Sequence, residues 1–243
     1  VESIIKNIKP DILINCVAKN GIKPCENDPT DAFTLNTLFP KHLAQLSNDL
    51  NFIFIHFSSD SIFDNSDGQY ITESITPKPM NVYSMSKYCA DCFIEVIAKK
   101  FYICRASLLI GDISKPLNEC NQFIENLLLR MQEGEKELRI ADDVIFSPTY
   151  AKDMIIKLKE LIETNAKYGI YHMVNSGKPS LYDIVNYIVD CMNVDVNVVR
   201  TSIKEFYPTI KRSTYYPMTS EKIGNMRNWK DAVKEYVEIY ILK

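Results

Sequence analysis

Three polar side chains in the middle of the chain have the types and spacing needed to reduce a carbonyl group. Ser59 ends an apolar run, and Tyr83 and Lys87 follow it. Tyr83 and Lys87 are four residues apart, so at the start of a helix both side chains project from one face. A free phenol has a pKa of about 10, and a nearby ammonium favours the phenolate. We therefore expect Lys87 to lower the pKa of Tyr83, Tyr83 to protonate the developing alkoxide and Ser59 to bind the substrate oxygen.

The hydride for such a reduction must come from a cofactor, because no side chain can supply one. The sequence nevertheless contains only 7 glycines among 243 residues, whereas ordinary usage is about 7%. The two nearest each other are Gly169 and Gly177, so the chain contains no glycine-rich phosphate loop. Taken alone, the glycine content argues against a dinucleotide-binding protein.

Apolar strands alternate with helices along the first half of the chain. Each expected strand is apolar throughout, which is typical of a parallel sheet covered on both faces. Ligands bind at the carboxyl ends of such strands, and Ser59 lies at one of these ends. The expected strands are Asp11–Val17, Phe52–Ser58 and Phe101–Ile110, and the expected helices are Asp31–Asn48 and the segment that carries Cys89. The sequence therefore predicts an α/β fold with a Rossmann-like, doubly wound parallel sheet.

The second half predicts a smaller substrate-binding region interleaved with the sheet. Ser180 is an expected helix N-cap, with Asp183 three residues later. Helices are expected at Phe123–Glu133, Ala151–Glu163, Leu181–Met192 and Trp229–Ile241, with a strand at Ile170–Val174. We assign residues 1–111 and 147–175 to the nucleotide-binding region, and residues 112–146 and 176–243 to the substrate-binding region.

Charge and composition exclude several classes of protein. The net charge of −3 lacks the basic footprint of a nucleic-acid binder. No stretch approaches the roughly 20 apolar residues that span a bilayer, so we expect no membrane segment. The seven cysteines are odd in number and scattered, which argues against a disulfide framework and favours a cytoplasmic protein. The three histidines lack the spacing of paired ligands, so no metal site is predicted.

The pair Cys89 and Cys92 could belong to a redox or zinc motif, but its neighbours favour packing. Cys89, Cys92, Phe93, Val96 and Ile97 recur at helical spacing. We therefore expect this stripe to be the core face of its helix, because a free cysteine behaves as a small hydrophobic residue.

Several motifs together resemble a known family over nearly the whole chain. The matching segments are Asn15–Ala18, Ser58–Asp64, Glu73, Pro79–Lys87, Arg105–Ser107, Ser147–Asp153, Gly169–His172 and Ser180–Asp183. They are similar to the N-A-A, S-T-D-Y-V-F-D, E…P-x-N-x-Y-x-x-x-K, R-T-S, S-P-T-Y-x-x-D, G-x-Y-H and S-W-Y-D/E motifs of the extended short-chain dehydrogenase/reductases. Within this group the chain resembles the dTDP-4-dehydrorhamnose reductases.

The resemblance implies that NADPH or NADH reduces the C4 keto group of a nucleotide-linked 6-deoxy-4-keto sugar. The catalytic residues that it implies are Ser59, Tyr83, Lys87 and Asn36. The cofactor-binding residues that it implies are Asn15, Cys16, Val17, Ala18, Tyr83, Lys87 and Ser107, with Lys87 also holding the nicotinamide ribose. The substrate-binding residues that it implies are Ser59, Asp60, Ser61, Leu108 and Arg212. The family often dimerises, so a homodimer is also expected.

Two of these positions depart from the family pattern and bear on which sugar is bound. Ser61 stands where the family has tyrosine, and Leu108 stands where it has tryptophan. The family's late K-R-P segment, which contacts substrate, reads Lys211-Arg212-Ser213 here.

Pro40 lies four residues after Asn36 and cannot donate a backbone hydrogen bond to the Asn36 carbonyl. One hypothesis is that this carbonyl holds a relay water leading to Lys87, and the other is a simple helix kink without a chemical role.

Other conspicuous residues favour structural interpretations. Ser58 and Asp60 are expected to shape the turn at the strand end, Arg105 to form an ion pair, and Asp153 to cap or pair at a helix start. The stretch with Phe206, Tyr207, Tyr215 and Tyr216 fits either loop packing, which we favour, or a sugar-nucleotide pocket.

Two other functions remain open at the level of sequence. One is a non-catalytic regulatory subunit of the same fold, like the β subunit of methionine adenosyltransferase, which also resembles this family and can carry S-S-D in place of S-T-D. The other is a bifunctional epimerase/reductase that acts on a UDP-linked sugar.

The resemblance also suggests why glycines are scarce. It places Asp11–Val17 as about the fourth strand of the fold, after a helix at Val1–Ile8. The glycine-rich turn belongs after the first strand, about 50 residues earlier. We therefore expect a chain that lacks this segment; if the sequence were complete, cofactor binding would be impaired and the regulatory interpretation would gain.

Overall fold

A four-stranded parallel sheet forms the centre of the molecule. The computed structural model describes residues 1–64, 68–111 and 123–241. The strands lie in the order β1-β2-β3-β8, and each neighbouring pair is parallel. Their bounds are β1 (Ile12–Asn15), β2 (Ile53–Ser59), β3 (Phe101–Ala106) and β8 (Gly169–His172). The predicted α/β fold with a parallel sheet is therefore confirmed.

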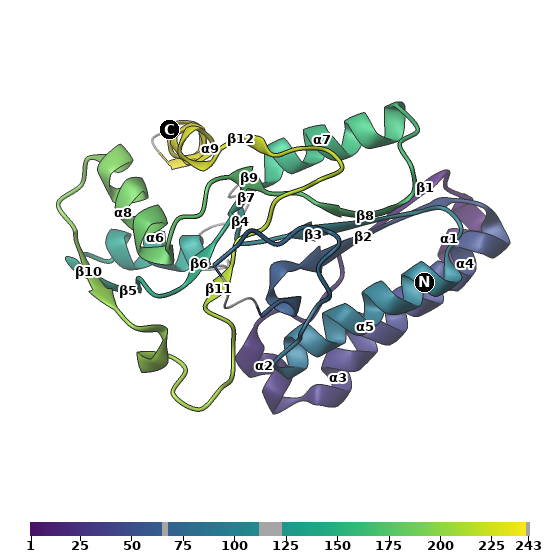
Figure 1. Cartoon of the computed structure of the whole chain (residues 1–243), viewed down its shortest axis with the longest axis horizontal. Helices are drawn as coiled ribbons and strands as arrows, with labels where there is room; N and C mark the ends of the chain where they lie inside the picture. The colour runs from purple at the N-terminus through teal and green to yellow at the C-terminus, as the bar shows by residue number, and fades with distance from the viewer. Residues whose placement is uncertain (65–67, 112–122, 242–243) are drawn as a thin grey trace.

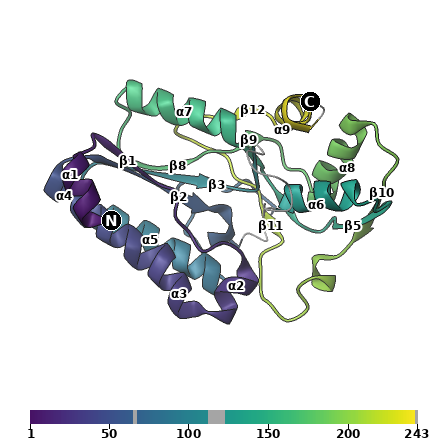
Figure 2. The same cartoon turned by 180° about the vertical axis from the view of Figure 1, so that it is seen from behind.

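Helices cover both faces of this sheet, which explains why its strands are apolar throughout (Figures 1 and 2). On one face Phe54 packs with Leu43 of α4 (Phe39–Leu50) and Ile94 of α5 (Val82–Ile97). On the other face Ile55 packs with Leu158 of α7 (Ala151–Glu163). The short helices at the start of the chain lie on the α5 side: α1 (Glu2–Ile8), α2 (Ile22–Asn27) and α3 (Pro29–Phe33).

The second half of the chain adds a group of elements at one end of the sheet, at the left of Figure 1. It contains α6 (Phe123–Gln132), β5 (Glu137–Ala141), α8 (Leu181–Met192), β10 (Asn197–Thr201) and α9 (Trp229–Tyr236). Three pairs of short strands join it to the sheet: β4 (Leu109–Ile110) with β7 (Thr149–Tyr150), β6 (Ile145–Phe146) with β11 (Tyr215–Tyr216), and β9 (Asn175–Ser176) with β12 (Met226–Asn228). The predicted capping of α8 is confirmed, because Ser180 and Asp183 form a reciprocal capping box.

Several predicted elements end differently in the structure. The predicted helix Asp31–Asn48 is interrupted by a π-helical turn, η1 (Thr34–Leu38), in which Phe39 N donates to Thr34 O. This turn ends two residues before Pro40 of α4, which has no N–H to donate to the Asn36 carbonyl. The predicted strand Phe101–Ile110 divides into β3 and β4, because the Ser107 N–H bonds the Thr149 hydroxyl at 3.0 Å instead of a neighbouring strand. The predicted last helix becomes π-helical after Tyr236.

The prediction for the core face of α5 was wrong. Cys92, Phe93 and Val96 are exposed, Val96 to 86%. The buried face instead carries Ser84, Ser86, Lys87, Ala90, Asp91 and Ile94. Periodicity locates the apolar side of a helix, but here polar side chains are buried because the sheet and η1 supply their partners.

Within the described part of the chain, no helix is both long enough and apolar enough to cross a membrane. Cys120 and residues 112–122 of the predicted substrate-binding region lie outside the described residues.

Candidate active site

A chain of hydrogen bonds surrounds Ser59 at the carboxyl end of β2. The Ser59 and Ser61 hydroxyls lie 2.9 Å apart, and Ser59 Oγ donates to Asp60 Oδ1 at 3.2 Å. The Ser107 hydroxyl donates to the other oxygen of the same carboxylate. Burial raises the pKa of Asp60 to about 6, although Ser107, Ser59 and the Arg212 charge lower it. The carboxyl group of Asp60 thus links two strand ends, and its pKa of about 6 lies well above the ordinary value of 3.8.

Tyr83 is brought to this cluster by the first turn of α5. Asn81 caps the helix in a capping box with Ser84, which fixes where the turn begins. Desolvation raises the pKa of Tyr83 to about 12, while an interaction with the Ser59 hydroxyl lowers it and the Asp60 charge raises it. Tyr83 is therefore protonated at neutral pH and can act as an acid.

Lys87 lies one turn further along α5 and is 4% exposed. Its ammonium Nζ donates to the Phe57 carbonyl at 2.6 Å. Burial lowers the pKa of Lys87 to about 8, and the Asp91 carboxylate opposes this effect. The sequence predicted that Lys87 lowers the pKa of Tyr83. In the structure the Ser59 hydroxyl does so, because the Lys87 ammonium is directed at a carbonyl of β2.

Asn36 joins the segment around Lys19 to α5. Its Oδ1 accepts from Lys19 N at 2.8 Å, and its Nδ2 donates to Lys19 O and to Ser86 Oγ, both at 3.0 Å. These bonds engage both the oxygen and the nitrogen of the carboxamide, so the Asn36 side chain holds the segment around Lys19 against α5. The main-chain carbonyl of Asn36 lies in the π-helical turn η1. Such turns are frequent at functional sites. The predicted water relay at that carbonyl stays a prediction.

The segment predicted to bind the cofactor lies at the carboxyl end of β1. The buried Asn15 side chain accepts from Val17 N at 3.1 Å, which turns its Nδ2 toward His56 Nδ1 at 3.2 Å. Cys16 and Val17 are exposed, and Ala18 is half-buried. Asn15 therefore shapes a turn whose next residues face solvent beside β2.

The remaining predicted substrate residues lie on different elements. Leu108, between β3 and β4, is partly buried against the core of the second group of elements. Arg212 donates from Nη2 to the Tyr216 hydroxyl at 3.2 Å, and its charge lowers the pKa of Asp60. The structure thus places Arg212 within electrostatic range of the cluster around Ser59.

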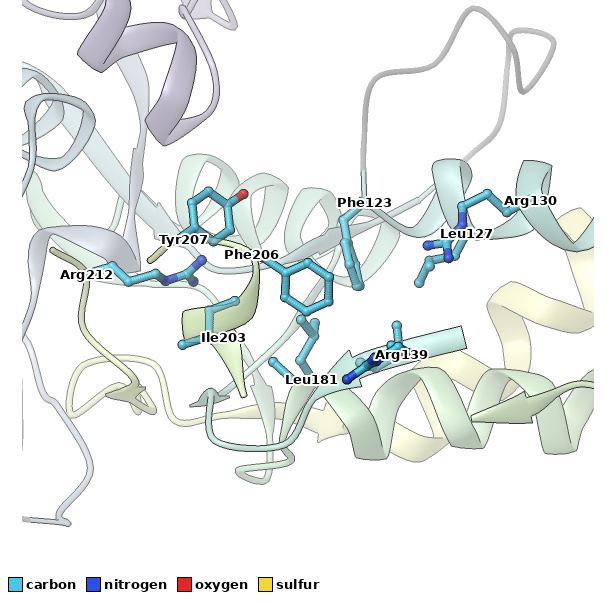
Figure 3. Close-up of a pocket in the computed structure, with 11 residues that line it drawn as sticks. Phe123, Leu127, Arg130, Arg139, Leu181, Ile203, Phe206, Tyr207 and Arg212 are labelled. Atoms are coloured by element: carbon cyan, nitrogen blue, oxygen red, sulfur yellow. The ribbon is translucent and has the colours of Figure 1, made fainter. Parts of the chain in front are cut away.

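A cavity of about 270 Å³ extends from Arg212 between α6, β5 and the short helix η4 (Ile203–Glu205). Figure 3 shows Phe123 and Phe206 side by side in it, with Tyr207 and Arg212 at one end. Its lining comprises Phe123, Leu127, Arg130, Arg139, Ile140, Ala141, Leu181, Ile203, Phe206, Tyr207 and Arg212. Sequence reasoning found Arg212 and considered the aromatic pair, but it missed Arg130 and Arg139.

The other tyrosines of the aromatic stretch pack loops. Tyr216 stacks on Phe146 with ring centroids 6.0 Å apart, and Tyr215 donates to the Gly68 carbonyl at 2.6 Å. The predicted ion pairs are also present. Arg105 Nε contacts Asp91 Oδ2 at 3.0 Å, and Arg227 Nε contacts Asp153 Oδ2 at 2.9 Å.

Comparison with known proteins assigns the family. The model of the RmlD substrate binding domain family matches residues 1–241. The chain belongs to this family. A spore coat polysaccharide biosynthesis protein, SpsK, of Bacillus subtilis is 26% identical over 95% of the chain and 80% of its own length. A dTDP-4-dehydrorhamnose reductase of Aggregatibacter actinomycetemcomitans is 27% identical over 93% of the chain and 74% of its own length.

Solved structures agree with this assignment. The dTDP-4-dehydrorhamnose reductase of Bacillus anthracis, crystallised with NADP, superposes with a TM-score of 0.89 at 26% identity, over 98% of the chain and 83% of that structure. The chain is also similar to a protein with a different kind of name. Methionine adenosyltransferase 2 subunit beta of Xenopus laevis is 26% identical over 82% of the chain and 60% of its own length. Among the described residues, no cluster of side chains has the composition of a metal site.

Proposed function

We propose that this RmlD-family chain is an NAD(P)H-dependent reductase of the C4 keto group of a nucleotide-linked 6-deoxy-4-keto sugar. The observation that carries the proposal is the approach of Tyr83 on α5 to Ser59 at the end of β2, with Lys87 on the same face of α5. The reductase relatives and the NADP-bound structure belong to the class of NAD(P)-dependent oxidoreductases.

The proposed reaction uses the protonation state that the structure gives to Tyr83. When bound, NAD(P)H would supply the hydride for C4, so that negative charge develops on the carbonyl oxygen. Ser59 Oγ donates a hydrogen bond to that oxygen, and Tyr83 Oη transfers its proton to it, leaving a hydroxyl on the sugar and a phenolate on Tyr83. Solvent then returns a proton to Tyr83. A phenol whose pKa is about 12 releases a proton only when a strong base such as an alkoxide forms beside it.

The residues at the end of β1 and on α5 fit a nicotinamide cofactor. Cys16 and Val17 are exposed beside β2, and Lys87 presents a buried cation to the same sheet edge. In this proposal Lys87 holds the nicotinamide ribose, while Asn15–Ala18 and Ser107 line the site. The sheet with residues 1–111 and 147–175 forms the nucleotide-binding region.

The cavity next to Arg212 suits the nucleotide half of the substrate. The rings of Phe206 and Tyr207 offer stacking surfaces for a base. Arg212 offers charge for the diphosphate, because guanidinium groups bind phosphate oxygens in a bidentate manner. In this proposal Ser61 and Leu108 border the sugar, and residues 112–146 and 176–243 form the substrate-binding region.

The test follows NAD(P)H absorbance with a dTDP-linked 4-keto-6-deoxy sugar. We expect turnover by the wild type and a loss of about 10²- to 10⁴-fold in kcat for Tyr83→Phe. Cofactor binding, measured by calorimetry, is expected to persist in the variant. Turnover that is unchanged in Tyr83→Phe would contradict the proposed role of this residue.

Two alternatives share the fold and are separated by the same assay. A regulatory subunit is supported by the similarity to methionine adenosyltransferase 2 subunit beta. It predicts no turnover with either a dTDP- or a UDP-linked sugar. A bifunctional enzyme predicts turnover of the UDP-linked sugar together with deuterium incorporation from heavy water at the epimerised carbon.

The exposed apolar stripe on α5 supports a homodimer. Met85, Phe93 and Val96 face solvent along one side of this helix, with Cys92 between them. Exposed apolar side chains that gather on one side of a helix are typical of an interface. We propose that a second copy of the chain covers it.

A further inference from the structure

Three charged side chains lie buried beneath α5, where the proposed reaction needs only one of them. Lys87 and Asp91 are on the helix, and Arg105 reaches them from β3. Their exposed fractions are 4%, 0% and 2%. Tyr83, Lys87 and Asp91 are each four residues apart, so they follow one another along a single face of α5. Asp91 is thus the next side chain along the line that carries the proposed acid and its lysine.

The hydrogen bonds of Lys87 do not balance its charge. Its ammonium donates to the Phe57 carbonyl, which is a neutral acceptor. Burying an ammonium without a counter-charge is costly, and the side chain then tends to lose its proton. The group that opposes this loss is Asp91, whose carboxylate raises the pKa of Lys87 against the effect of burial.

Asp91 in turn depends on Arg105. Burial raises the pKa of Asp91, while Arg105, the Ser58 hydroxyl and Lys87 lower it. The ion pair uses Oδ2, at 3.0 Å from Arg105 Nε. Arg105 therefore helps to keep Asp91 ionised.

The other titratable groups around Lys87 do not replace Asp91. On β2, His56 is buried, and burial together with the Lys87 charge holds its pKa well below the usual value. It is therefore neutral and offers no negative charge. Further along α5, Glu95 lies at the exposed side of the helix, within reach of the Arg105 and Asp91 charges. On α2, Cys25 is buried, and burial raises the pKa of its thiol.

We propose that Asp91 is a positioning residue that acts through Lys87, its buried carboxylate, one turn further along the same face of α5, serving as the counter-charge of the buried lysine. This inference rests on the proposed function in one respect, which is that the proposed function assigns Lys87 to cofactor binding and catalysis. The simpler interpretation is that Asp91 and Arg105 merely join α5 to β3.

The experiment titrates Lys87 directly, without turnover. The ¹³Cε resonance of Lys87, assigned through Lys87→Met, is followed against pH in the wild type, Asp91→Asn and Asp91→Glu. We expect the pKa of Lys87 to fall by about 1 to 3 pH units in Asp91→Asn, because an opposite charge nearby shifts a pKa by that amount. Asp91→Glu keeps the charge and is expected to restore most of the wild-type value.

Glu125→Gln serves as the matched control, because it also replaces a buried carboxylate, on α6, with an amide. It is expected to leave the titration of Lys87 unchanged. If Asp91→Asn does not fold, the double variant Asp91→Asn/Arg105→Gln, which removes both charges of the Arg105–Asp91 ion pair, is expected to lower the pKa of Lys87 in the same direction.

The proposal would be overturned if the pKa of Lys87 were the same in folded Asp91→Asn as in the wild type. It would also be overturned if Asp91→Glu lowered this pKa as much as Asp91→Asn does. Because the readout is a resonance of the free protein, it decides the role of Asp91 even if no sugar nucleotide is reduced. A failed reductase assay with a shifted titration would therefore refute only the proposed function.

Discussion

The Ser61 hydroxyl lies 2.9 Å from the Ser59 hydroxyl. Ser59 also receives a bond from Ser61 N at 3.2 Å and donates to Asp60 at 3.2 Å. Ser59 is thus oriented by several bonds, and the loss of one of them leaves its position defined.

Ser59→Ala and Ser61→Ala are therefore expected to differ in their effects on catalysis. Removing one donor to a developing oxyanion costs about 10²- to 10³-fold in kcat, and we expect such a loss for Ser59→Ala. Ser61→Ala keeps the bonds from Ser59 to Asp60, and we expect less than about a 10-fold loss. Steady-state kinetics on both variants measures the difference. A loss of less than about 10-fold for Ser59→Ala would contradict its contact with the reacting oxygen.

The raised pKa of Asp60 predicts how stability depends on pH. Between the unfolded value of 3.8 and the folded value of about 6, the native state binds more protons than the unfolded state. The free energy of unfolding therefore falls as pH rises through this window. At about 1.4 kcal/mol for each pH unit, the contribution from Asp60 falls by about 3 kcal/mol.

Denaturant unfolding of the wild type and Asp60→Asn at several pH values measures this contribution. As pH rises from 4 to 6, we expect the free energy of unfolding of the wild type to fall relative to that of Asp60→Asn. Ser107→Ala removes a hydrogen bond that lowers the pKa of Asp60, so it is expected to extend the window upward. A constant difference across this range would contradict the assignment.

Gly177 is a position where the backbone and the packing both require glycine. Its φ is +111°, and a Cβ there would lie 2.4 Å from Trp229 Cδ1. Gly177→Ala is expected to reduce the free energy of unfolding by about 2 to 5 kcal/mol, from strained backbone and overpacking together. Gly134 has φ +92° with no atom within 4 Å of an added Cβ, so Gly134→Ala isolates the backbone strain, about 1 to 2 kcal/mol. Equal losses in thermal or denaturant unfolding would refute the clash with Trp229.

The sheet could be predicted from the sequence because its strands carry the signal within themselves. Phe54 and Ile55 are neighbours in sequence and face opposite layers of helices, so the strand that contains both is apolar without alternation. Ser59 follows directly at the carboxyl end of that strand, so the same apolar run also placed it at the ligand-binding edge.

The buried side of α5 could not be predicted in this way. The partners of Ser86 and Asp91 are Asn36 and Arg105, which are remote in sequence or on another element. Periodicity reports which face is apolar, not which polar residues find buried partners. Arg130 and Arg139 in the cavity next to Arg212 were missed for the same reason, because they lie on α6 and β5, which only the fold brings together.

The wrong prediction for α5 leads to the last experiment. Val96 is 86% exposed near the end of α5, and Phe93 beside it is contacted by Lys41 of α4, whose Nζ lies 4.9 Å from the ring centroid. If a second copy of the chain covers this stripe, a charge introduced into it would be desolvated on association. Val96→Glu is therefore expected to weaken dimerisation by at least about 100-fold, from about 3 kcal/mol of desolvation cost.

Sedimentation velocity over a range of protein concentrations measures this change. Ile156→Glu on α7 is the matched control, because Ile156 is also an exposed β-branched apolar residue, at 59%, on the opposite face of the sheet. It is expected to leave the dimer intact. The same oligomeric state for wild type and Val96→Glu would refute the interface on α5. Dissociation by Ile156→Glu alone would place the interface on α7, because only a residue inside the contact has its new charge desolvated.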